Sequence, residues 1–407
     1  MQILWTIALA LLAAHAIVLL VYWSVGLARI HRSLKALPSA RDGAASARQR
    51  PCTEPVCVII PAHNEAGVIG ELIASLRQQT HPTVRFVLAL DRCTDDTLKI
   101  ARELTMGDDR FEIIEITECP EGWAGKVNAV WTAFNASDAA KNASHLICAD
   151  ADTVFDPELV AASCALVRDR ELDMLSYVSD LSARSWFEKI VQPACGVELL
   201  YQYPILRANG SGVHRRAFAN GQFMLFTRDA YERLGGHEAV SEAMLEDMAL
   251  ARLAADLDLR VGIFMSDRML RVRMYDCWDA FRTGWKRIYI DCAKRKLSRL
   301  QRYAWRVRWV GTVLPTCAFA GVLLSIIPTS APEFARWIAG GLCALGLGVW
   351  LVAMGYIYRR GGFPLWSVPL NPIANWLLGR LLFEAADDLE SGRPVKWGGR
   401  SYLIEPR

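Results

Sequence analysis

The segment His145–Phe155, HLICADADTVF, decides the fold class of this chain. Its apolar run predicts a buried strand, and the run ends in the carboxylates of Asp150 and Asp152. Residues two apart on a strand point the same way, so both carboxylates should converge just past the strand's end. A hard cation such as Mg²⁺ or Mn²⁺ binds carboxylate oxygens and completes its shell with substrate phosphates. The motif alone is weak, because a surface Asp-x-Asp pair is usually only solvated.

Three further segments place acidic residues on similar elements. Val56–Leu76, VCVIIPAHNEAGVIGELIASL, predicts a buried strand that Pro61 ends, then a polar turn and a helix. Open α/β sheets bind their ligands at such a turn. Arg85–Thr97, RFVLALDRCTDDT, predicts a second strand that ends in Asp91. Met244–Leu250, MLEDMAL, carries adjacent acids inside an apolar helical stretch.

Short apolar strands alternate with helical segments from about residue 55 onward, which is the signature of βαβ units. The sequence therefore predicts an α/β domain over 55–280. We expect 1–27 to be an N-terminal membrane anchor and 28–54 a basic linker, flexible over Ser39–Pro51. The remaining segments are a basic amphipathic juxtamembrane stretch (281–309), a transmembrane hairpin (310–358), and an interfacial or re-entrant segment with a tail (359–407).

Four motifs in the same order resemble the signature of family-2 glycosyltransferases on a GT-A fold. They are Pro61-Ala62-His63-Asn64-Glu65, Asp91 with Asp95, Asp150-Ala151-Asp152, and Glu246-Asp247. Three more, Gly122–Lys126, Gly221–Phe226 and Val395–Tyr402, are similar to the membrane-anchored branch that includes hopanoid-associated, carotenoid-type and ceramide-type glucosyltransferases. The Gln/Arg-x-x-Arg-Trp motif of processive and ceramide-type members is not intact. The nearest stretch is Arg282–Arg287, RTGWKR, which argues against chain polymerisation and ceramide specificity.

The resemblance implies a nucleotide-diphosphate sugar, most simply a UDP-sugar, bound by the motif that opens at Pro61. Glu65 and Asp91 stand at the carboxyl ends of the first two strands, where they can accept hydrogen bonds from the base and ribose. The less favoured alternative for Glu65 is a helix-start residue stabilised by the helix dipole. For Asp95, a helix cap explains the position nearly as well as ligand contact. Lys126 is expected to reach a phosphate or sugar hydroxyl, although an exposed lysine is often only a solvated charge. Arg287 is expected to support the leaving diphosphate.

The same resemblance implies that Asp150 and Asp152 bind Mg²⁺ or Mn²⁺. Asp152 is expected to ligate directly, while the sequence leaves open whether Asp150 holds the metal's waters or the ribose. Asp247 is the candidate general base, because inverting transfer to a hydroxyl requires a positioned proton acceptor. Glu246 is its alternative, and a helix-start pair of solvated acids would explain both. Gln222 is expected near the acceptor.

The apolar run Ile3–Val25 is long enough to cross a bilayer, and a cleaved signal peptide is the less favoured alternative. Basic residues that follow this run place that side in the cytoplasm. Val310–Ile327 and Trp337–Tyr358 predict the hairpin, which returns the chain to the same side. Phe363–Phe383 is apolar but interrupted by prolines and an arginine, so we expect it to be interfacial or re-entrant rather than a fourth span.

The net charge of +3 is too small to indicate nucleic-acid binding. The basic and aromatic stretch Phe281–Trp309 runs directly into an apolar segment, so attraction to anionic lipid explains it better than RNA binding. Eleven cysteines without paired spacing fit a reducing compartment and make a zinc site unlikely on spacing grounds.

The sequence therefore predicts an integral membrane protein, in the inner membrane if bacterial, with its catalytic domain in the cytoplasm. Its expected activity is inverting transfer of a hexose from a nucleotide sugar to an isoprenoid or triterpenoid lipid at the cytoplasmic leaflet. A processive polysaccharide synthase would need more spans and the intact motif. A non-catalytic scaffold would have lost the acidic pairs, which are present here.

Overall fold

The computed structural model describes residues 1–210, 216–243, 245–393, 395–397 and 400–402 of the 407. The chain divides into two compact units. We call Ala36–Ser182 with Tyr203–Met274 the sheet unit, and Met1–Lys35, Ala183–Gln202 and Tyr275–Arg407 the helical unit. Residues 183–202, which the sequence analysis placed within the catalytic domain, therefore pack with the helical unit.

A seven-stranded sheet in the order β3-β2-β1-β4-β8-β6-β9 forms the centre of the sheet unit. All neighbouring pairs are parallel except those that β8 makes with β4 and β6. This is the mixed α/β sheet of a GT-A fold. The strands are β1 (Val56–Ala62), β2 (Val84–Asp91), β3 (Phe111–Ile116), β4 (His145–Ala149), β6 (Met174–Val178), β8 (Phe223–Thr227) and β9 (Val261–Met265).

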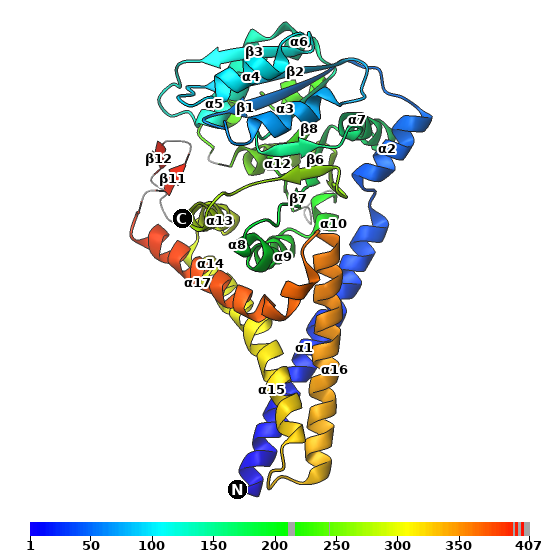
Figure 1. The fold of residues 1–407 in the computed structure, drawn as a ribbon, viewed down its shortest axis with the longest axis vertical. Helices are drawn as coiled ribbons and strands as arrows, with labels where there is room; N and C mark the ends of the chain where they lie inside the picture. Colours follow the sequence, from blue (N-terminus) through cyan, green and yellow to red (C-terminus); the bar gives the residue numbers. More distant parts are fainter. Residues whose placement is uncertain (211–215, 244, 394, 398–399, 403–407) are drawn as a thin grey trace. The chain divides into compact units, whose positions relative to one another are not determined.

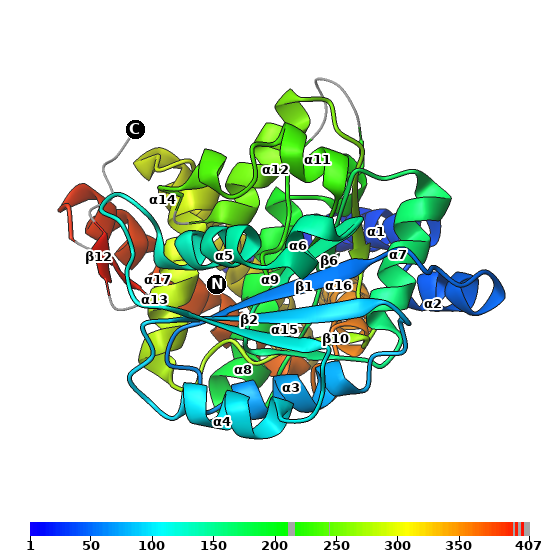
Figure 2. The same cartoon turned by 90° about the horizontal axis from the view of Figure 1, so that it is seen from above.

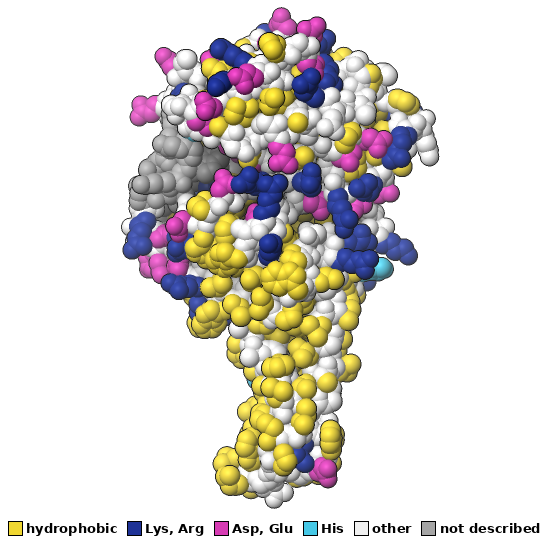
Figure 3. All heavy atoms as spheres, in the orientation of Figure 1, with side chains coloured by type: hydrophobic (Ala, Val, Ile, Leu, Met, Phe, Trp, Pro, Cys, Tyr) yellow, Lys and Arg dark blue, Asp and Glu magenta, His cyan; other side chains and the backbone are white. Residues whose placement is uncertain are grey.

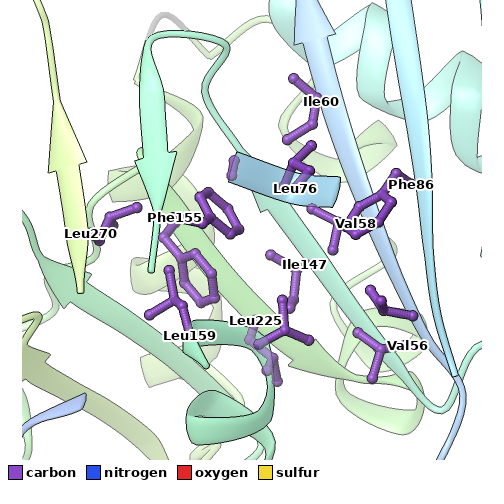
Figure 4. Packing of buried hydrophobic residues seen from close by; sticks show 14 of the residues in the cluster. Val56, Val58, Ile60, Leu76, Phe86, Ile147, Phe155, Leu159, Leu225 and Leu270 are labelled. Atoms are coloured by element: carbon purple, nitrogen blue, oxygen red, sulfur yellow. The ribbon is translucent and has the colours of Figure 1, made fainter. Parts of the chain in front are cut away.

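Helices cover both faces of this sheet, because the strands are apolar on both. In Figure 2, α3 and α4 lie on the opposite side of β1 and β2 from α5 and α6. Val58, Ile60 and Phe86 point into the core on the α3 side, together with Ile147 and Leu225 (Figure 4). The helices are α3 (Ile69–Arg77), α4 (Thr97–Thr105), α5 (Gly125–Ala136), α6 (Asp138–Asn142), α7 (Leu159–Arg170), α10 (Ile205–Ala208), α11 (Arg228–Arg233), the 3₁₀ turn η2 (Glu238–Val240) and α12 (Glu246–Asp256).

A second sheet has three short strands in the order β5-β10-β7, and its strand β5 follows β4 along the chain. β5 (Thr153–Phe155) pairs antiparallel with β10 (Leu270–Val272), which runs parallel to β7 (Asp180–Leu181). The Asp150–Asp152 turn therefore connects a strand of the large sheet to a strand of the small one, and both ends of the turn are fixed.

Pro61 lies inside β1 and does not end it, contrary to the sequence-based expectation. It pairs in register with Ala89 of β2. On the other side, β1 pairs with β4 only from Val56 to Ile59. Pro61 thus lies beyond the part of β1 that β4 covers, where the absence of an N–H on that side removes no ladder hydrogen bond.

Residues 39–51 are not a flexible linker, because they contain the helix α2 (Ala40–Gln49). Small residues line its buried face, including Ala40, Gly43 and Ala44, and this face packs against α7. A run of Ala, Gly and Ser resembles a linker in composition, but it also lets two helices approach closely. Burial against α7 decided between the two outcomes.

The helical unit contains three helices that are long and apolar enough to cross a membrane: Gln2–Ala36, Leu297–Ile326 and Glu333–Arg360. Within it, α1 (Gln2–Ala36), α15 (Leu314–Ile326) and α16 (Glu333–Arg360) share an apolar cluster that includes Leu19, Ala318 and Trp350. Hydrophobic side chains cover the visible face of this bundle (Figures 1 and 3). The N-terminal anchor and the transmembrane hairpin that the sequence predicts thus correspond to helices of sufficient length and hydropathy to cross a membrane.

The second of these helices begins earlier than the sequence predicts. It is continuous through α14 (Leu297–Arg306), the π-helical segment η3 (Val307–Val313) and α15. Pro315 follows this segment, and a proline inside a helix clashes with the carbonyl group four residues earlier. The wider π turn, which such prolines favour, accommodates that clash without breaking the helix.

The expected interfacial segment forms a 3₁₀ turn, η4 (Leu365–Leu370), followed by α17 (Asn371–Glu390). α17 packs against α14, η3 and α13 (Trp278–Cys292), and it crosses the bundle instead of running alongside it (Figure 1). It is not among the three helices suited to spanning. Residues 186–202 form two helices, α8 (Trp186–Ile190) and α9 (Gln192–Gln202), with Pro193 at the second position of α9. The hairpin β11 (Val395–Trp397) and β12 (Arg400–Tyr402) closes the described chain, while Gly398 and Gly399 of the predicted tail motif lie outside the described residues.

The docking of α2 can be tested with Gly43→Ala. In an isolated helix this change is favourable by about 1 kcal/mol. A Cβ at Gly43, however, would lie 2.4 Å from the carbonyl oxygen of Ala162 on α7. We therefore expect the free energy of unfolding to fall by about 1–3 kcal/mol, as for overpacked cores. Thermal unfolding of the full chain in detergent measures it, with Ala45→Leu on the exposed side of α2 as a control. A raised melting temperature in Gly43→Ala would mean that α2 is not docked.

Candidate active site

The candidate site lies at one edge of the large sheet, where several strands end. Asp91 is the last residue of β2, and Asp150 follows β4 directly. β8 runs antiparallel to β4, with Ala149 paired to Phe223, so the residues that precede β8 lie at this same edge. The predicted convergence of strand-end carboxylates is therefore present within the sheet unit.

Lys126 occupies the centre of this edge. It lies in the first turn of α5, and its ammonium forms an ion pair with Asp150 Oδ1 at 2.6 Å. A second, short ion pair joins it to Glu246 Oε1 in the first turn of α12. Burial would lower the pKa of Lys126, but the two carboxylates raise it above its usual value. Lys126 is therefore a charged hub and not the solvated lysine of the alternative interpretation.

Gly221 forms the surface around which these charged groups gather. A Cβ at this position would lie 3.0 Å from both Glu246 Oε1 and Lys126 Nζ, and 3.3 Å from Asp247 Oδ2. The carbonyl oxygen of Gly221 also lies 3.5 Å from Lys126 Nζ. A larger residue would therefore need these side chains to shift by a few tenths of an ångström.

Asp247 is half-buried and held by backbone donors. Its Oδ2 accepts a hydrogen bond from Gly221 N–H at 2.8 Å, and its Oδ1 accepts one from Met248 N–H at 2.6 Å. Burial and the adjacent Glu246 raise the pKa of Asp247 to about 7, against the lowering effects of Lys126 and these two donors. A carboxylate with a pKa near neutrality and a fixed orientation suits a general base.

Glu246 is in a different electrostatic state from its neighbour. It is 4% exposed. Burial alone would raise its pKa, but the Lys126 ammonium outweighs burial, and the pKa of Glu246 is lowered. The adjacent acids therefore differ in pKa: Glu246 is an ionised partner of Lys126, and Asp247 has a pKa near neutrality.

Asp152 has a carboxylate oxygen that is available to a metal ion. Its Oδ1 is buried and has no hydrogen-bond partner among the described residues. Burial, Asp150 and Glu65 together raise the pKa of Asp152 well above its usual value. Carboxylates crowded in this way fit a divalent cation, which would relieve their repulsion. Within the described residues no group of three or more His, Cys, Asp or Glu side chains could hold a metal. The fit is therefore to an ion that takes further ligands from substrate phosphates.

Asp91 is engaged by a residue that the sequence analysis did not single out. Arg92 binds it through two hydrogen bonds, Nε to Oδ1 at 2.8 Å and Nη2 to Oδ2 at 2.7 Å. A Cβ at Gly125 would lie 3.2 Å from Arg92 Nη2 and 3.3 Å from Asp91 Oδ2, so this pair abuts the start of α5. The Asp91–Arg92 pair thus lies beside the first turn of α5, which carries Lys126.

Asp95 joins the two loops that follow β1 and β2. Its Oδ1 accepts hydrogen bonds from the backbone and hydroxyl of Thr97, and its Oδ2 accepts one from Ala66 N–H at 3.1 Å. The Thr97 hydroxyl in turn lies 2.8 Å from the N–H of Glu65. Asp95 therefore connects the two loops, while the N-cap position of α4 is Asp96. Glu65 lies before α3, which begins at Ile69.

The remaining predicted residues are placed as follows. Gln222 is buried, and its Oε1 accepts hydrogen bonds from Ser179 and from Asn220 Nδ2, so its contact with an acceptor stays a prediction. Pro61 is a buried residue of β1. Arg287 lies on α13 of the helical unit, and its role at the diphosphate stays a prediction.

Comparison with known proteins identifies the family of this chain. The sequence profile described as "Glycosyltransferase like family 2" matches residues 54–294, which is more than half of the chain. The chain belongs to the family-2 glycosyltransferases. The matched region contains every motif that carried the resemblance except the tail.

Among curated relatives of this glycosyltransferase is a 4,4'-diaponeurosporenoate glycosyltransferase of Staphylococcus aureus. It is 21% identical over 351 residues, which cover 85% of this chain and 88% of the relative. Similar solved structures include a mannosyltransferase of Pyrobaculum calidifontis in complex with GDP-Man and Mn²⁺, with a TM-score of 0.47, 17% identity, and coverage of 93% and 98% of the two chains. Another is S. aureus TarS 1–349 in complex with UDP-GlcNAc, with a TM-score of 0.40, 13% identity, and coverage of 86% and 96%.

The hub can be tested with Lys126→Met, which keeps the length of the side chain and removes its charge. Asp150 and Glu246 then lose their counter-ion, and we expect the free energy of unfolding at neutral pH to fall by about 3–5 kcal/mol. Because Lys126 lowers the pKa of Glu246, this stabilisation is present at neutral pH and lost as the pH falls through that pKa. The deficit should therefore shrink in acid, which thermal unfolding at two pH values measures.

The matched control is Lys141→Met, which breaks an exposed pair with Asp138 at 3.5 Å. A surface pair contributes about 0–1 kcal/mol, so this variant should melt close to wild type. Equal losses in the two variants would show that the hub has no special role.

Proposed function

We propose that this glycosyltransferase moves a hexose, with inversion, from a nucleotide-diphosphate sugar to a lipid hydroxyl at the cytoplasmic leaflet. The convergence of Lys126, Asp150, Glu246 and Asp247 around Gly221 is the observation that carries this proposal. It supplies cationic and acidic groups at the edge of the sheet where open α/β folds bind ligands.

The donor, most simply a UDP-sugar, is assigned to the edge formed by β1, β2 and β4. Glu65, in the motif that begins at Pro61, and Asp91, at the end of β2, accept hydrogen bonds from the base and ribose. Asp91 is already paired with Arg92, so its contribution is a fixed acceptor surface rather than a free carboxylate. Asp150 and Asp152 would hold Mg²⁺ or Mn²⁺, which when bound supplies charge stabilisation to the departing diphosphate.

The proton of the acceptor is assigned to Asp247. As the acceptor oxygen bonds to the anomeric carbon, the bond from that carbon to the phosphate oxygen breaks, and its electron pair leaves with the diphosphate. The acceptor's proton passes to Asp247, whose two backbone hydrogen bonds keep the carboxylate oriented. Lys126 offsets the charge of the leaving group, and Glu246 keeps Lys126 in place.

The lipid acceptor is supported by the helical unit. Three helices suited to spanning would keep the enzyme at a membrane, where an amphiphilic substrate is concentrated. The S. aureus relative is named for 4,4'-diaponeurosporenoate, a carotenoid acid, and supports an isoprenoid or triterpenoid acceptor at low identity. Gln222, beside Gly221, is the proposed acceptor-side residue. Basic residues 29–50 and 281–309 favour a cytoplasmic location for the sheet unit.

The test of this function is incorporation of a labelled sugar into lipid. Purified full chain, reconstituted with a bacterial lipid extract and a labelled UDP-hexose or GDP-hexose, should produce label that partitions into organic solvent and has the mass of a glycosylated lipid. Asp152→Asn and excess chelator should each abolish this product. The substitution removes a proposed ligand of the cation, and the chelator removes the cation itself.

Two results would contradict the proposal. Label found only in water-soluble polymer would indicate a polysaccharide synthase. No transfer from any nucleotide sugar, with the acidic residues intact, would support a non-catalytic scaffold. Full activity in excess chelator would remove the metal role of Asp150 and Asp152 while leaving the lipid acceptor in place.

Asp247→Asn separates catalysis from binding. The variant keeps the shape of the side chain but cannot take a proton, so turnover should fall by about two to four orders of magnitude. Donor affinity, measured by calorimetry, should stay near wild type, because the donor contacts lie elsewhere. In wild type the rate should rise with pH and level off above the pKa of Asp247, which is about 7.

Glu246→Gln is the comparison variant and should retain more activity than Asp247→Asn. A variant Asp247→Asn with more than about a tenth of the wild-type rate, or an inactive Glu246→Gln beside it, would place the base elsewhere.

A further inference from the structure

Arg308 lies at the border of an apolar span and has no counter-ion among the described residues. It is the penultimate residue before the uncharged stretch Val310–Ile327. Its Nε is buried and has no hydrogen-bond partner in the described part of the chain. No carboxylate of the described residues lies within ion-pair distance of it. A guanidinium in such surroundings is costly unless an anion accompanies it.

The side chain of Arg308 is held by α17. Its Cζ lies 4.3 Å from the ring centroid of Trp376 and 4.8 Å from that of Phe383. Gly379, on the same face of α17, makes room for it, since a Cβ there would lie 2.6 Å from Cγ and 2.8 Å from Nε. Two aromatic faces and a glycine therefore fix the guanidinium, and cation–π contacts leave its charge uncancelled.

Two other basic residues of the helical unit, Arg306 and Lys286, have carboxylate partners. Arg306, two residues earlier, also lies over an aromatic ring, that of Tyr201 at 4.0 Å, but it forms an ion pair with Glu198. Lys286 lies 2.5 Å from Asp388. Arg308 thus differs from these two basic residues in having a buried Nε with no hydrogen-bond partner among the described residues.

The surroundings of Arg308 fit the polar–apolar boundary of a bilayer. Trp305 is 63% exposed, Trp309 51% and Trp376 50%. Trp305 also packs edge-on against Phe383, with ring centroids 5.4 Å apart. Exposed tryptophans of this kind lie at the headgroup level of membrane proteins. The π-helical turn η3 carries Arg308 itself, and π turns often mark functional positions.

We propose that Arg308, seated between Trp376 and Phe383, binds the phosphate of an anionic phospholipid. A planar guanidinium can donate two parallel hydrogen bonds to phosphate oxygens, which an ammonium cannot match. Basic sites beside transmembrane helices are known to bind headgroups in this way. The half-buried side chain stays accessible at the level where lipid phosphates lie. This site is separate from the transfer reaction and does not depend on it.

The test is native mass spectrometry of the full chain in non-ionic detergent, titrated with phosphatidylglycerol. We expect Arg308→Gln to weaken binding of the first lipid molecule about tenfold or more, the scale of a lost charged hydrogen bond. Arg308→Lys keeps the charge but not the fork, and should lie between the two. Gly379→Ala keeps the arginine and displaces it from its seat, so it should also weaken binding even if Arg308→Gln fails to fold.

The matched control is Arg302→Gln, which removes one positive charge from the exposed side of the same continuous helix. It should leave the first binding constant near wild type. Equal weakening by Arg302→Gln and Arg308→Gln would reduce the effect to general attraction and overturn the site. Displacement of the lipid by millimolar inorganic phosphate would also overturn it, because the occupant would then be a soluble anion.

Discussion

The organisation of the sheet unit depends on one buried ammonium between two carboxylates. Lys126 joins α5 to the β4 turn through Asp150 and to α12 through Glu246, so three elements distant in sequence are tied at one point. The ion pair also sets the electrostatics of its neighbours. It keeps Glu246 ionised, and an ionised Glu246 raises the pKa of Asp247. A carboxylate with a pKa near neutrality is therefore a consequence of the way the fold is held together.

The sequence predicted this edge of the sheet well, because the ends of β2 and β4 are marked by Asp91 and Asp150. Asp91 and Asp150 follow apolar runs that can only be buried strands, and parallel strands bring their carboxyl ends together. The three helices that are long and apolar enough to cross a membrane were also predictable, since a long uncharged stretch has few other structures. Family-2 membership followed from the order of these motifs, and the matching profile confirms it.

Features that depend on packing between distant segments could not be predicted in the same way. Gly221 looked like part of a motif, yet its role is to let Lys126, Glu246 and Asp247 approach one another. Arg92 stands next to Asp91 in sequence, which was a usable signal, but strand neighbours normally point to opposite faces. That pattern fails here because Arg92 already adopts a left-handed backbone conformation, with φ of 47°. Arg308 was one basic residue among many until its missing partner distinguished it.

Asp95 connects the loop that follows β1 to the loop that follows β2, so that the two loops are held together. One carboxylate binds Ala66 of the first loop and Thr97 of the second, and Thr97 reaches Glu65. Ordering either loop therefore orders the other, and the conformational entropy of both is lost once, on folding, and not again on binding. A nucleotide would meet a preformed cradle, so its affinity should owe little to induced fit. Selectivity between nucleotides then resides in the shape of that cradle and not in the motion of its parts.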